Sequence, residues 1–524
     1  MLSFVACKSE DQGSKPKEEA AVTNEEVKTE EKVTYPEAEV DEDQAITLAS
    51  YRDMAPGEKD GYYCSWALYV WEPLVTQDTK GTPIPCLAES WEMSEDGKTW
   101  TFNLRKGVKF HNGEDFNADA VIANLDRIKP EIKASGFYPL DINSHYPGLV
   151  SYEKVDEYTV KYVFENPVPT QIFNMVNWGS AIYSPTNFDA NNDFNGPAIG
   201  TGPFMIKDHV KDQYVTLSRN EDYWGEKAKA KEIIVKAIPD ADTKYSALMS
   251  GEILGVLDLN AINPAYAHDL EENSKDFSVV TAKSTMIRFL IPNGTRFPFN
   301  DQRMKEAVSL ILDRDEIVNE IHYGYGVPTT NILNYSTPFY KEFPVEHDVE
   351  KAKALAQEVL QGQEVTIDFL YNGKDSVLKS ECELVQSYLE ELGLKVNLVP
   401  LEYSEVRERM KAGDFDLARA QQGLSNGEAF TIFSRFMVTT GDHNKNYSLG
   451  YDLPEVNELM AKASKALDME ERKEIYNEIQ EISTKTLPII PLFNDKTVLA
   501  HSNKITGYDA QLYGLELPHI SWSK

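Results

Sequence analysis

Residues 365–418 alternate between strand-like and helix-like segments, and this alternation restricts the fold more than any other feature of the chain. Three runs rich in apolar residues are typical of strands: residues 365–370, 394–401 and 415–418. Helical periodicity separates them over residues 377–392 and 405–411, and Gly393 and Gly413 are suited to end these helices. Strands and helices alternating at this spacing imply right-handed βαβ units and a mostly parallel sheet.

Residues 88–128 predict a β-hairpin followed by a capped helix. Apolar residues alternate with polar ones on both strands, and Asp96-Gly97 between them is typical of a tight turn. Asn117 is placed to cap a helix whose apolar side chains share one face: Val121, Ile122, Leu125 and Ile128. The hairpin and helix form a local unit, but their geometry states no function.

The length and charge of the chain exclude several classes of protein. At 524 residues the chain is too long for one ordinary core and suits two or three lobes. A formal net charge of −33 repels nucleic acids and anionic membranes, so we expect neither as a partner. The four cysteines show no metal-binding spacing, and whether Cys64 and Cys86 pair stays open.

The N-terminus predicts a lipid anchor. Residues 1–7 resemble the end of a bacterial lipoprotein signal, truncated and closing on Cys7 as the lipidated residue. Residues 8–44 are rich in charged residues and nearly free of aromatic ones, which predicts a disordered tether. A chance match and an ordinary frayed terminus are the alternatives. We expect an extracytoplasmic protein that contacts the membrane only through this anchor.

The sequence gives no specific support for an enzyme. It contains no nucleophile elbow, no His-Glu-x-x-His and no phosphate-binding P-loop. The nine histidines are scattered singly, and a single histidine is more often structural than catalytic. We therefore expect no catalytic residue.

Several motifs occur in one order along the first half of the chain: Glu72-Pro-Leu, the hairpin stretch, GTGPF from Gly200, YWG from Tyr223, IPDADT from Ile238 and ALMSGEI from Ala247. In this order they resemble the family 5 extracellular solute-binding proteins of peptide and nickel ABC importers, and the wording is closest to the nickel-binding branch. The resemblance implies an α/β fold of two lobes joined by a hinge, with mixed sheets flanked by helices and an extra subdomain in lobe I. It places lobe I at residues 45–284 plus 498–524, the accessory subdomain at 81–198, and lobe II at 285–497.

The resemblance also implies a function. The chain is expected to capture a nickel or similar metal chelate between the lobes, as a monomer without covalent cofactor, and to deliver it to an ABC permease with its ATPase. A di- or oligopeptide is the alternative ligand, and a hydrolase on the same scaffold ranks lowest. Peptide-binding relatives anchor the α-amino group with an acid, and Gly423 stands at that position here.

Seven residues are site candidates. His443 matches the metal-binding histidine of the nickel branch, because it follows the Phe433-Ser434 run at nearly the same spacing. A neutral imidazole suits Ni²⁺. Arg419 is expected to bind a chelator's carboxylate, and Gln421 replaces part of an aromatic floor. The remaining candidates are Phe137 and Tyr403 as aromatic lining, Cys64 near the metal, and Cys7 for lipidation. The branch's arginine in lobe I matches only Arg127 or Lys133.

Overall fold

The computed structural model describes residues 44–54, 66–78, 82–129, 142–175, 180–191, 194–258, 262–423, 429–512 and 514–523. The chain divides into two units, Met1–Glu37 and Ala38–Lys524, and all described residues lie in the second. The predicted signal with Cys7, nearly all of the predicted tether, and the site candidates Cys64 and Phe137 lie outside the described residues.

One large mixed sheet carries the fold. Within the described ranges it has 11 strands in the order β15-β14-β16-β12-β17-β11-β1-β10-β9-β8, and β13 pairs with β17 beside this path. Its strands are β1 (Ile46–Ser50), β8 (Phe204–Val210), β9 (Tyr214–Arg219), β10 (Glu232–Ala237), β11 (Gly255–Val256), β12 (Phe277–Pro292), β13 (Gly326–Pro328), β14 (Val365–Asn372), β15 (Leu394–Leu401), β16 (Leu417–Gly423) and β17 (Ile490–Ser502).

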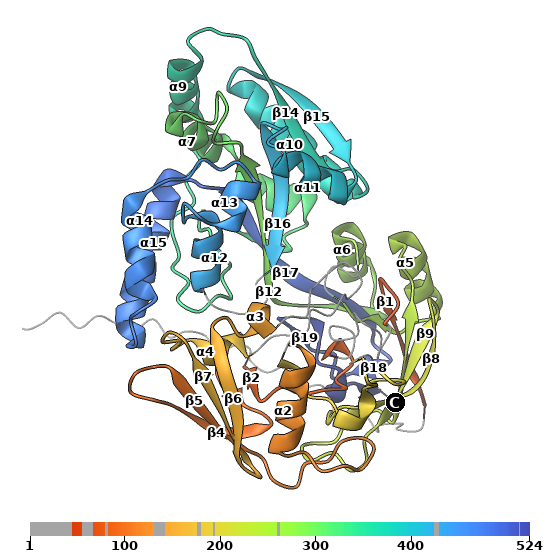
Figure 1. The fold of residues 1–524 in the computed structure, drawn as a ribbon. Helices are drawn as coiled ribbons and strands as arrows, with labels where there is room; N and C mark the ends of the chain where they lie inside the picture. The colour runs from red at the N-terminus through yellow and green to blue at the C-terminus, as the bar shows by residue number, and fades with distance from the viewer. Residues whose placement is uncertain are drawn as a thin grey trace, which may run out of the picture. The chain divides into compact units, whose positions relative to one another are not determined.

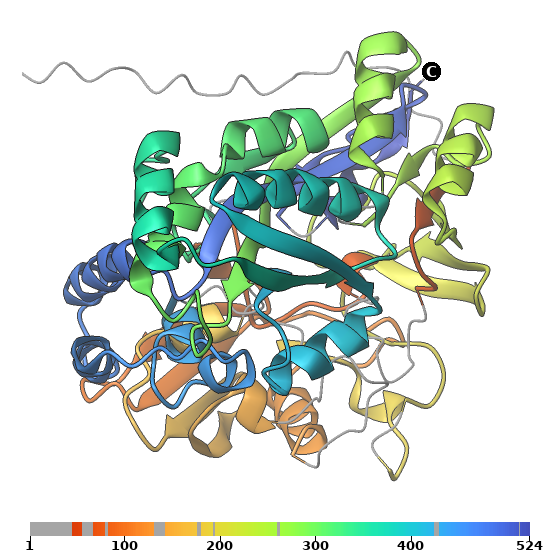
Figure 2. The same cartoon turned by 90° about the horizontal axis from the view of Figure 1, so that it is seen from above.

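The βαβ units predicted from the alternating segments are confirmed. Strand β14 pairs in parallel with β15 and with β16, and the intervening helices are α10 (Ser376–Glu391) and α11 (Tyr403–Lys411). Figure 2 shows α10, in teal, lying across β14 and β15, with which it is in contact. The sheet is less parallel than the alternation suggested, because β16 pairs in the antiparallel sense with β12 on its other side.

Strands β12 and β17 connect two halves of the structure. They pair in the antiparallel sense from Phe277 opposite Ser502 to Leu290 opposite Ile490, with an irregularity between Lys283 and Ile287. One buried cluster holds apolar residues from positions 46–270 and 498–520 together with Tyr325, and two further clusters lie within residues 287–493. The fold is thus two-lobed, with two long strands running between the lobes; the exact lobe boundaries stay a prediction.

The hairpin and capped helix predicted at residues 88–128 are confirmed. Strands β4 (Ala88–Met93) and β5 (Thr99–Leu104) pair across a turn in which Gly97 has φ +69°. Asn117 caps helix α2 (Ala118–Arg127), and its side chain accepts a hydrogen bond from the Ala120 amide. The hairpin continues into a four-stranded sheet of order β4-β5-β7-β6 with β6 (Leu149–Asp156) and β7 (Thr159–Phe164). Figure 1 shows α2 packed against β6 in this subdomain.

Aspartate or asparagine side chains cap most of the longer helices, as helix-start chemistry favours. Helices with such a cap are α5 (Ala241–Ser250), α6 (Pro264–Asn273), α7 (Gln302–Ile311), α8 (Arg314–Glu316), α9 (Val349–Leu360), α10 and α15 (Met469–Thr486). The other helices are α3 (Ile142–His145), α4 (Gln171–Asn174), η2 (Pro185–Asn187), η3 (Ile317–Ile321), α12 (Ala429–Phe436), α13 (Asp442–Asn446), α14 (Pro454–Ala463) and η4 (Leu517–His519).

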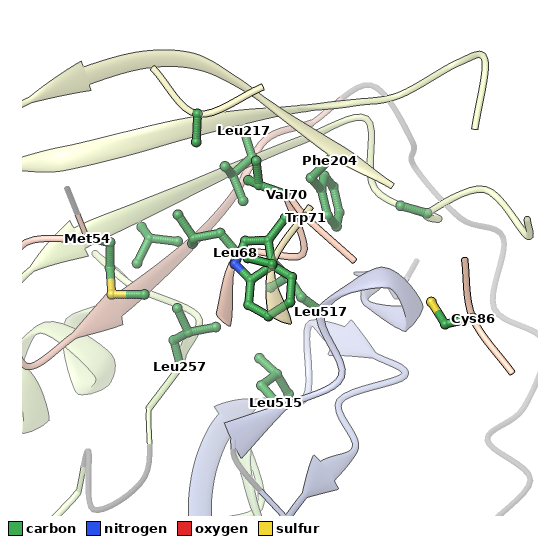
Figure 3. Close-up of a cluster of buried hydrophobic side chains, with 14 of the residues drawn as sticks. Met54, Leu68, Val70, Trp71, Cys86, Phe204, Leu217, Leu257, Leu515 and Leu517 are labelled. Atoms are coloured by element: carbon green, nitrogen blue, oxygen red, sulfur yellow. The ribbon is translucent and has the colours of Figure 1, made fainter. Parts of the chain in front are cut away.

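Three small two-stranded sheets complete the description: β2 (Val75–Gln77) with β3 (Pro83–Pro85), β18 (Ile505–Thr506) with β21 (Ser521–Trp522), and β19 (Ala510–Gln511) with β20 (Gly514–Leu515). The C-terminal segment packs into the core of the first lobe, where Leu515 and Leu517 lie close to Trp71 and Leu257 (Figure 3). In the described ranges, no helix is both long and apolar enough to span a membrane.

Candidate functional site

Helices α12 and α13 are joined by a turn that only glycine fits, and this turn positions His443. A Cβ on Gly441 would lie 2.3 Å from the carbonyl oxygen of Arg435 and 2.5 Å from that of Ser434. Such separations are far below van der Waals contact, so the chain can fold back onto the end of α12 only without a side chain here. Helix α13 therefore begins directly beside α12 and brings His443 against Phe436.

The imidazole of His443 is held between two aromatic rings. Its ring centroid lies 4.7 Å from that of Phe436 and 4.8 Å from that of Tyr447, both edge-on, and its side chain is 16% exposed. Its Nδ1 lies 3.0 Å from Oδ1 of Asp442. An ionised carboxylate can only accept, so Nδ1 carries the proton and Nε2 keeps its lone pair.

The surroundings of His443 keep the ring neutral. Burial is the main cause that lowers the pKa of His443 to about 4; the positive charges of Arg435 and Arg407 contribute to this decrease, and Asp442 opposes it. A neutral imidazole whose second nitrogen is fixed by a carboxylate is the arrangement found around metal-binding histidines. His443 is thus chemically suited to bind a transition metal through Nε2.

Tyr403 lies in the same group of helices. Its side chain, at the start of α11, is 54% exposed, and the guanidinium of Arg407 lies 6.0 Å from the centre of its ring. Helix α11 contacts α13, and both Tyr403 and Arg407 lie near enough to act electrostatically on Tyr447, whose pKa burial raises. Two residues predicted from the sequence, Tyr403 and His443, therefore belong to one cluster on α11, α12 and α13.

Arg419 does not fit the role predicted for it. Its side chain is 1% exposed, with Nε 2.6 Å from Oε1 and Nη2 3.0 Å from Oε2 of Glu381, and Nη1 donates to the carbonyl of Ala420. His322 Nε2 lies 2.9 Å from Oε2 of the same carboxylate. The charge of Arg419 is neutralised inside the lobe, which corrects the expectation that it lines the cleft and binds a ligand's carboxylate.

The carboxyl group of Glu381 depends on these two basic partners. Burial alone would raise the pKa of Glu381, but the charges and hydrogen bonds of Arg419 and His322 hold it well below its ordinary value. The three side chains form a buried ion-pair network with a structural role.

Gln421 belongs to a different polar group. Its side chain is exposed, and its Oε1 accepts a hydrogen bond of 2.6 Å from Nη1 of Arg288 on the neighbouring strand β12. Arg288 also pairs with Asp495 on β17, with Nη2 2.7 Å from Oδ2. Gln421 therefore completes a side-chain network across the adjacent strands β16, β12 and β17.

Arg127 is buried against aromatic rings and is not exposed to solvent. Its guanidinium lies over the rings of Phe188 and Phe194, 4.1 Å and 5.0 Å from their centres, and the residue is 4% exposed. This stacking gives Arg127 a packing role between α2 and residues 188–194. The other match for the branch's arginine, Lys133, lies outside the described residues.

Sequence reasoning missed a buried carboxylate, Glu72. Its two oxygens accept hydrogen bonds from Tyr223 at 2.7 Å, Trp224 at 2.8 Å and Thr201 at 2.8 Å. Burial raises the pKa of Glu72, and these three donors oppose the increase. All four residues lie in the ordered motifs, so the motifs themselves were the signal that could have found this network.

The position of the lost peptide-anchoring acid is crowded. A Cβ on Gly423 would lie 2.9 Å from Sδ of Met286 on strand β12. An aspartate here would require the Met286 side chain to move. The packing around residue 423 therefore suits glycine better than an acid.

Comparisons with known proteins identify a family that the chain matches. The family described as bacterial extracellular solute-binding proteins, family 5 Middle, matches residues 82–444. The dipeptide-binding protein of Escherichia coli is 27% identical, covering 81% of this chain and 83% of its own, and the nickel-binding periplasmic protein of the same organism is 29% identical, covering 66% and 69%. Other relatives are named for binding heme and glutathione.

Comparison with solved structures identifies the fold. The structure of NikA from Brucella suis in complex with Fe(III)-EDTA matches with a TM-score of 0.81 at 23% sequence identity, covering 92% of this chain and all of that one. The expectation of a two-lobed fold of the periplasmic-binding-protein type is thereby confirmed.

Proposed function

Because the chain belongs to the bacterial extracellular solute-binding proteins, family 5, we propose that it captures a chelate of nickel or a similar metal and delivers it to an ABC permease. Proteins of this family are the binding components of ABC importers, act outside the cytoplasm together with permease and ATPase subunits, and are not enzymes. The hydrolase alternative is therefore set aside. The metal chelate as cargo is the part that we propose.

The geometry of His443 carries this proposal. A metal that arrives inside an organic chelator needs few ligands from the protein, and one neutral imidazole is a suitable donor for Ni²⁺ and its neighbours. Asp442 fixes the ring with Nδ1 protonated, which leaves Nε2 as the donor atom. Because the pKa of His443 is about 4, no proton has to leave the ring at neutral pH before a metal binds.

Two arginines near His443 suit the carboxylates of a chelator. Arg435 Nε lies 3.8 Å from Oδ2 of Asp442 and its side chain is 41% exposed, and the guanidinium of Arg407 on α11 lies 6.0 Å from the centre of the Tyr403 ring. Both remain at the edge of the cluster, unlike Arg419. We therefore assign the recognition of carboxylates to Arg407 and Arg435, with Tyr403 as the exposed aromatic surface beside them.

A di- or oligopeptide is the second candidate. Relatives named for binding dipeptides and glutathione cover four fifths of this chain, which favours it. Against it stands Gly423, where the acid that would hold a peptide's α-amino group is missing and Met286 occupies the space. A buried ammonium without a carboxylate partner is costly, so the peptide candidate ranks second.

Calorimetric titration separates the two candidates. We expect Ni²⁺ with excess free histidine to bind the purified protein, His443→Ala to lose that binding, and a mixture of di- and tripeptides to give no response. His347→Ala is a matched control in the same lobe, because His347 is half-exposed and only loosely paired with Asp313 at 3.5 Å. Tight peptide binding without any response to the nickel chelate would overturn the proposal.

The lipid anchor on Cys7 and the monomeric state belong to the same proposal. Mass spectrometry of the protein from its native cells should find a diacylglyceryl group on Cys7. Detection of an unmodified N-terminus that includes Met1 would rule the anchor out. Gel filtration with light scattering should give a mass near the 59.2 kDa of one chain.

A further inference from the structure

Three metal-ligating side chains meet in the C-terminal segment, away from the cluster around His443. His519 Nδ1 lies 3.4 Å from Oε2 of Glu516 and 3.8 Å from Oδ2 of Asp509. One ligand atom from each residue lies within 4.8 Å of the other two, and all three residues are half-buried. Nothing in the proposed transport function uses this group.

The backbone holds these residues in a fixed arrangement. The Glu516 amide donates to the Asp509 carbonyl at 3.0 Å across the β19–β20 hairpin, and the His519 amide donates to the Glu516 carbonyl at 3.2 Å. A Cβ on Gly507 would lie 2.1 Å from the His519 carbonyl oxygen, so the neighbouring chain packs directly against this turn.

Apolar anchors on both sides of Glu516 fix its position. Leu515 and Leu517 are 5% and 0% exposed and insert into the core of lobe I (Figure 3). A carboxylate between two buried leucines has little freedom to move away from its neighbours. The backbone position of Glu516 is therefore fixed by the fold.

The charges of the group are unbalanced. Among the described residues, the ion pairs of Asp509 and of Glu516 are both formed with His519. Two carboxylates at this separation repel each other, and one imidazole does not offset both. Gln511 donates from Nε2 to Oε2 of Glu516 at 2.7 Å, which orients that carboxylate as outer partners do around metals.

We propose that Asp509, Glu516 and His519 bind a divalent transition-metal ion of the zinc type on lobe I. Ligand atoms about 2.0 to 2.2 Å from a tetrahedral metal lie about 3.4 Å from one another. The two distances from His519 come close to this value, and a water would complete the coordination. An imidazole nitrogen among the donors favours zinc, nickel or copper over calcium and magnesium.

Such an ion would cross-link the β19–β20 hairpin to the η4 turn within the C-terminal segment. The segment ends beside the start of the folded unit, where Trp522 Nε1 donates to the Gln44 carbonyl at 3.1 Å. An ion bound between the β19–β20 hairpin and the η4 turn would hold this contact in place. The role is structural and independent of the cargo.

Zinc titration of the full chain tests the site. The background carries His443→Ala, so that the proposed cargo site contributes nothing. We expect one Zn²⁺ per chain, with loss of that binding in His519→Ala and in Glu516→Gln, about tenfold weaker binding in Gln511→Leu, and no binding of Ca²⁺. His347→Ala is again the control and should leave zinc binding unchanged.

A second measurement separates a lost site from a damaged fold. Without zinc, the variants should melt at the temperature of the parent, because the three ligands are half-exposed; with zinc, only the parent and the His347→Ala control should gain thermal stability. Equal zinc binding and equal stabilisation in parent, His519→Ala and Glu516→Gln would overturn the site. This result would leave the proposal for His443 untouched, and failure of the nickel chelate to bind would leave this site untouched.

Discussion

Removing one member of the buried network of Glu381, Arg419 and His322 should destabilise the protein strongly. The side chains of Arg419 and Glu381 are 1% and 0% exposed and share two hydrogen bonds of 2.6 Å and 3.0 Å. Glu381→Met leaves the guanidinium buried without a counter-charge, and Arg419→Met leaves the carboxylate with His322 alone. Breaking a buried pair in this way costs about 3–5 kcal/mol, so we expect each single substitution to lower the free energy of unfolding by that amount.

The double substitution predicts a different result. Glu381→Met combined with Arg419→Met removes both charges and replaces them with apolar volume, and such replacements are often neutral. We therefore expect the double variant to be more stable than either single variant, within about 2 kcal/mol of the parent. The sign of the difference between double and single variants distinguishes a buried pair from two independent contacts.

Urea unfolding followed by tryptophan fluorescence measures these free energies, and calorimetric titration with the nickel chelate measures binding for each folded variant. Glu364→Met is the control, because the ion pair between Glu364 and Lys395 is exposed and should contribute nothing measurable. The reasoning is refuted if Arg419→Met keeps the stability of the parent but loses the ligand. That outcome would return Arg419 to the role that the sequence suggested.

Burial lowers the pKa of His443 to about 4, so chelate binding through the neutral ring should persist as the pH falls through ~6.5 and disappear only near pH 4; a binding midpoint near the ordinary histidine pKa would contradict the burial argument. Gly200→Ala would place a Cβ 2.0 Å from the carbonyl oxygen of Val70 and should cost about 3 kcal/mol in urea unfolding, a prediction that an unchanged midpoint would refute. Asn117→Ala should cost about 1 kcal/mol through the lost cap of α2, whereas Asn117→Asp should keep it.

The local elements could be predicted because their signals are local. The hairpin at Asp96-Gly97 and the cap at Asn117 depend on residues a few positions apart, and the βαβ units follow from apolar periodicity. The antiparallel pairing of β16 with β12 could not be predicted in the same way. It joins residues 417–423 to residues 286–292, and nothing within either segment states its partner.

The candidate site shows the same division. His443 could be named because it follows a recognisable run, and its neighbour Asp442 is adjacent in the sequence. The role of Arg419 could not be read, because its partner Glu381 lies 38 residues away on another element. An arginine in a strand looks the same in the sequence whether its charge faces a ligand or a buried carboxylate.

The motifs that identify the family do not identify the cargo. Glu72, Thr201, Tyr223 and Trp224 come from three separate motifs, and all meet at one buried carboxylate in lobe I. A buried carboxylate needs every donor, so losing any one of them is costly whatever the protein carries. Relatives named for heme, dipeptides, glutathione and nickel all match this chain, so membership of the family leaves the cargo open. We expect the cargo to be set by residues outside the motifs, and we expect substitutions of His443 and its neighbours on α11, α12 and α13 to change the ligand without unfolding the protein.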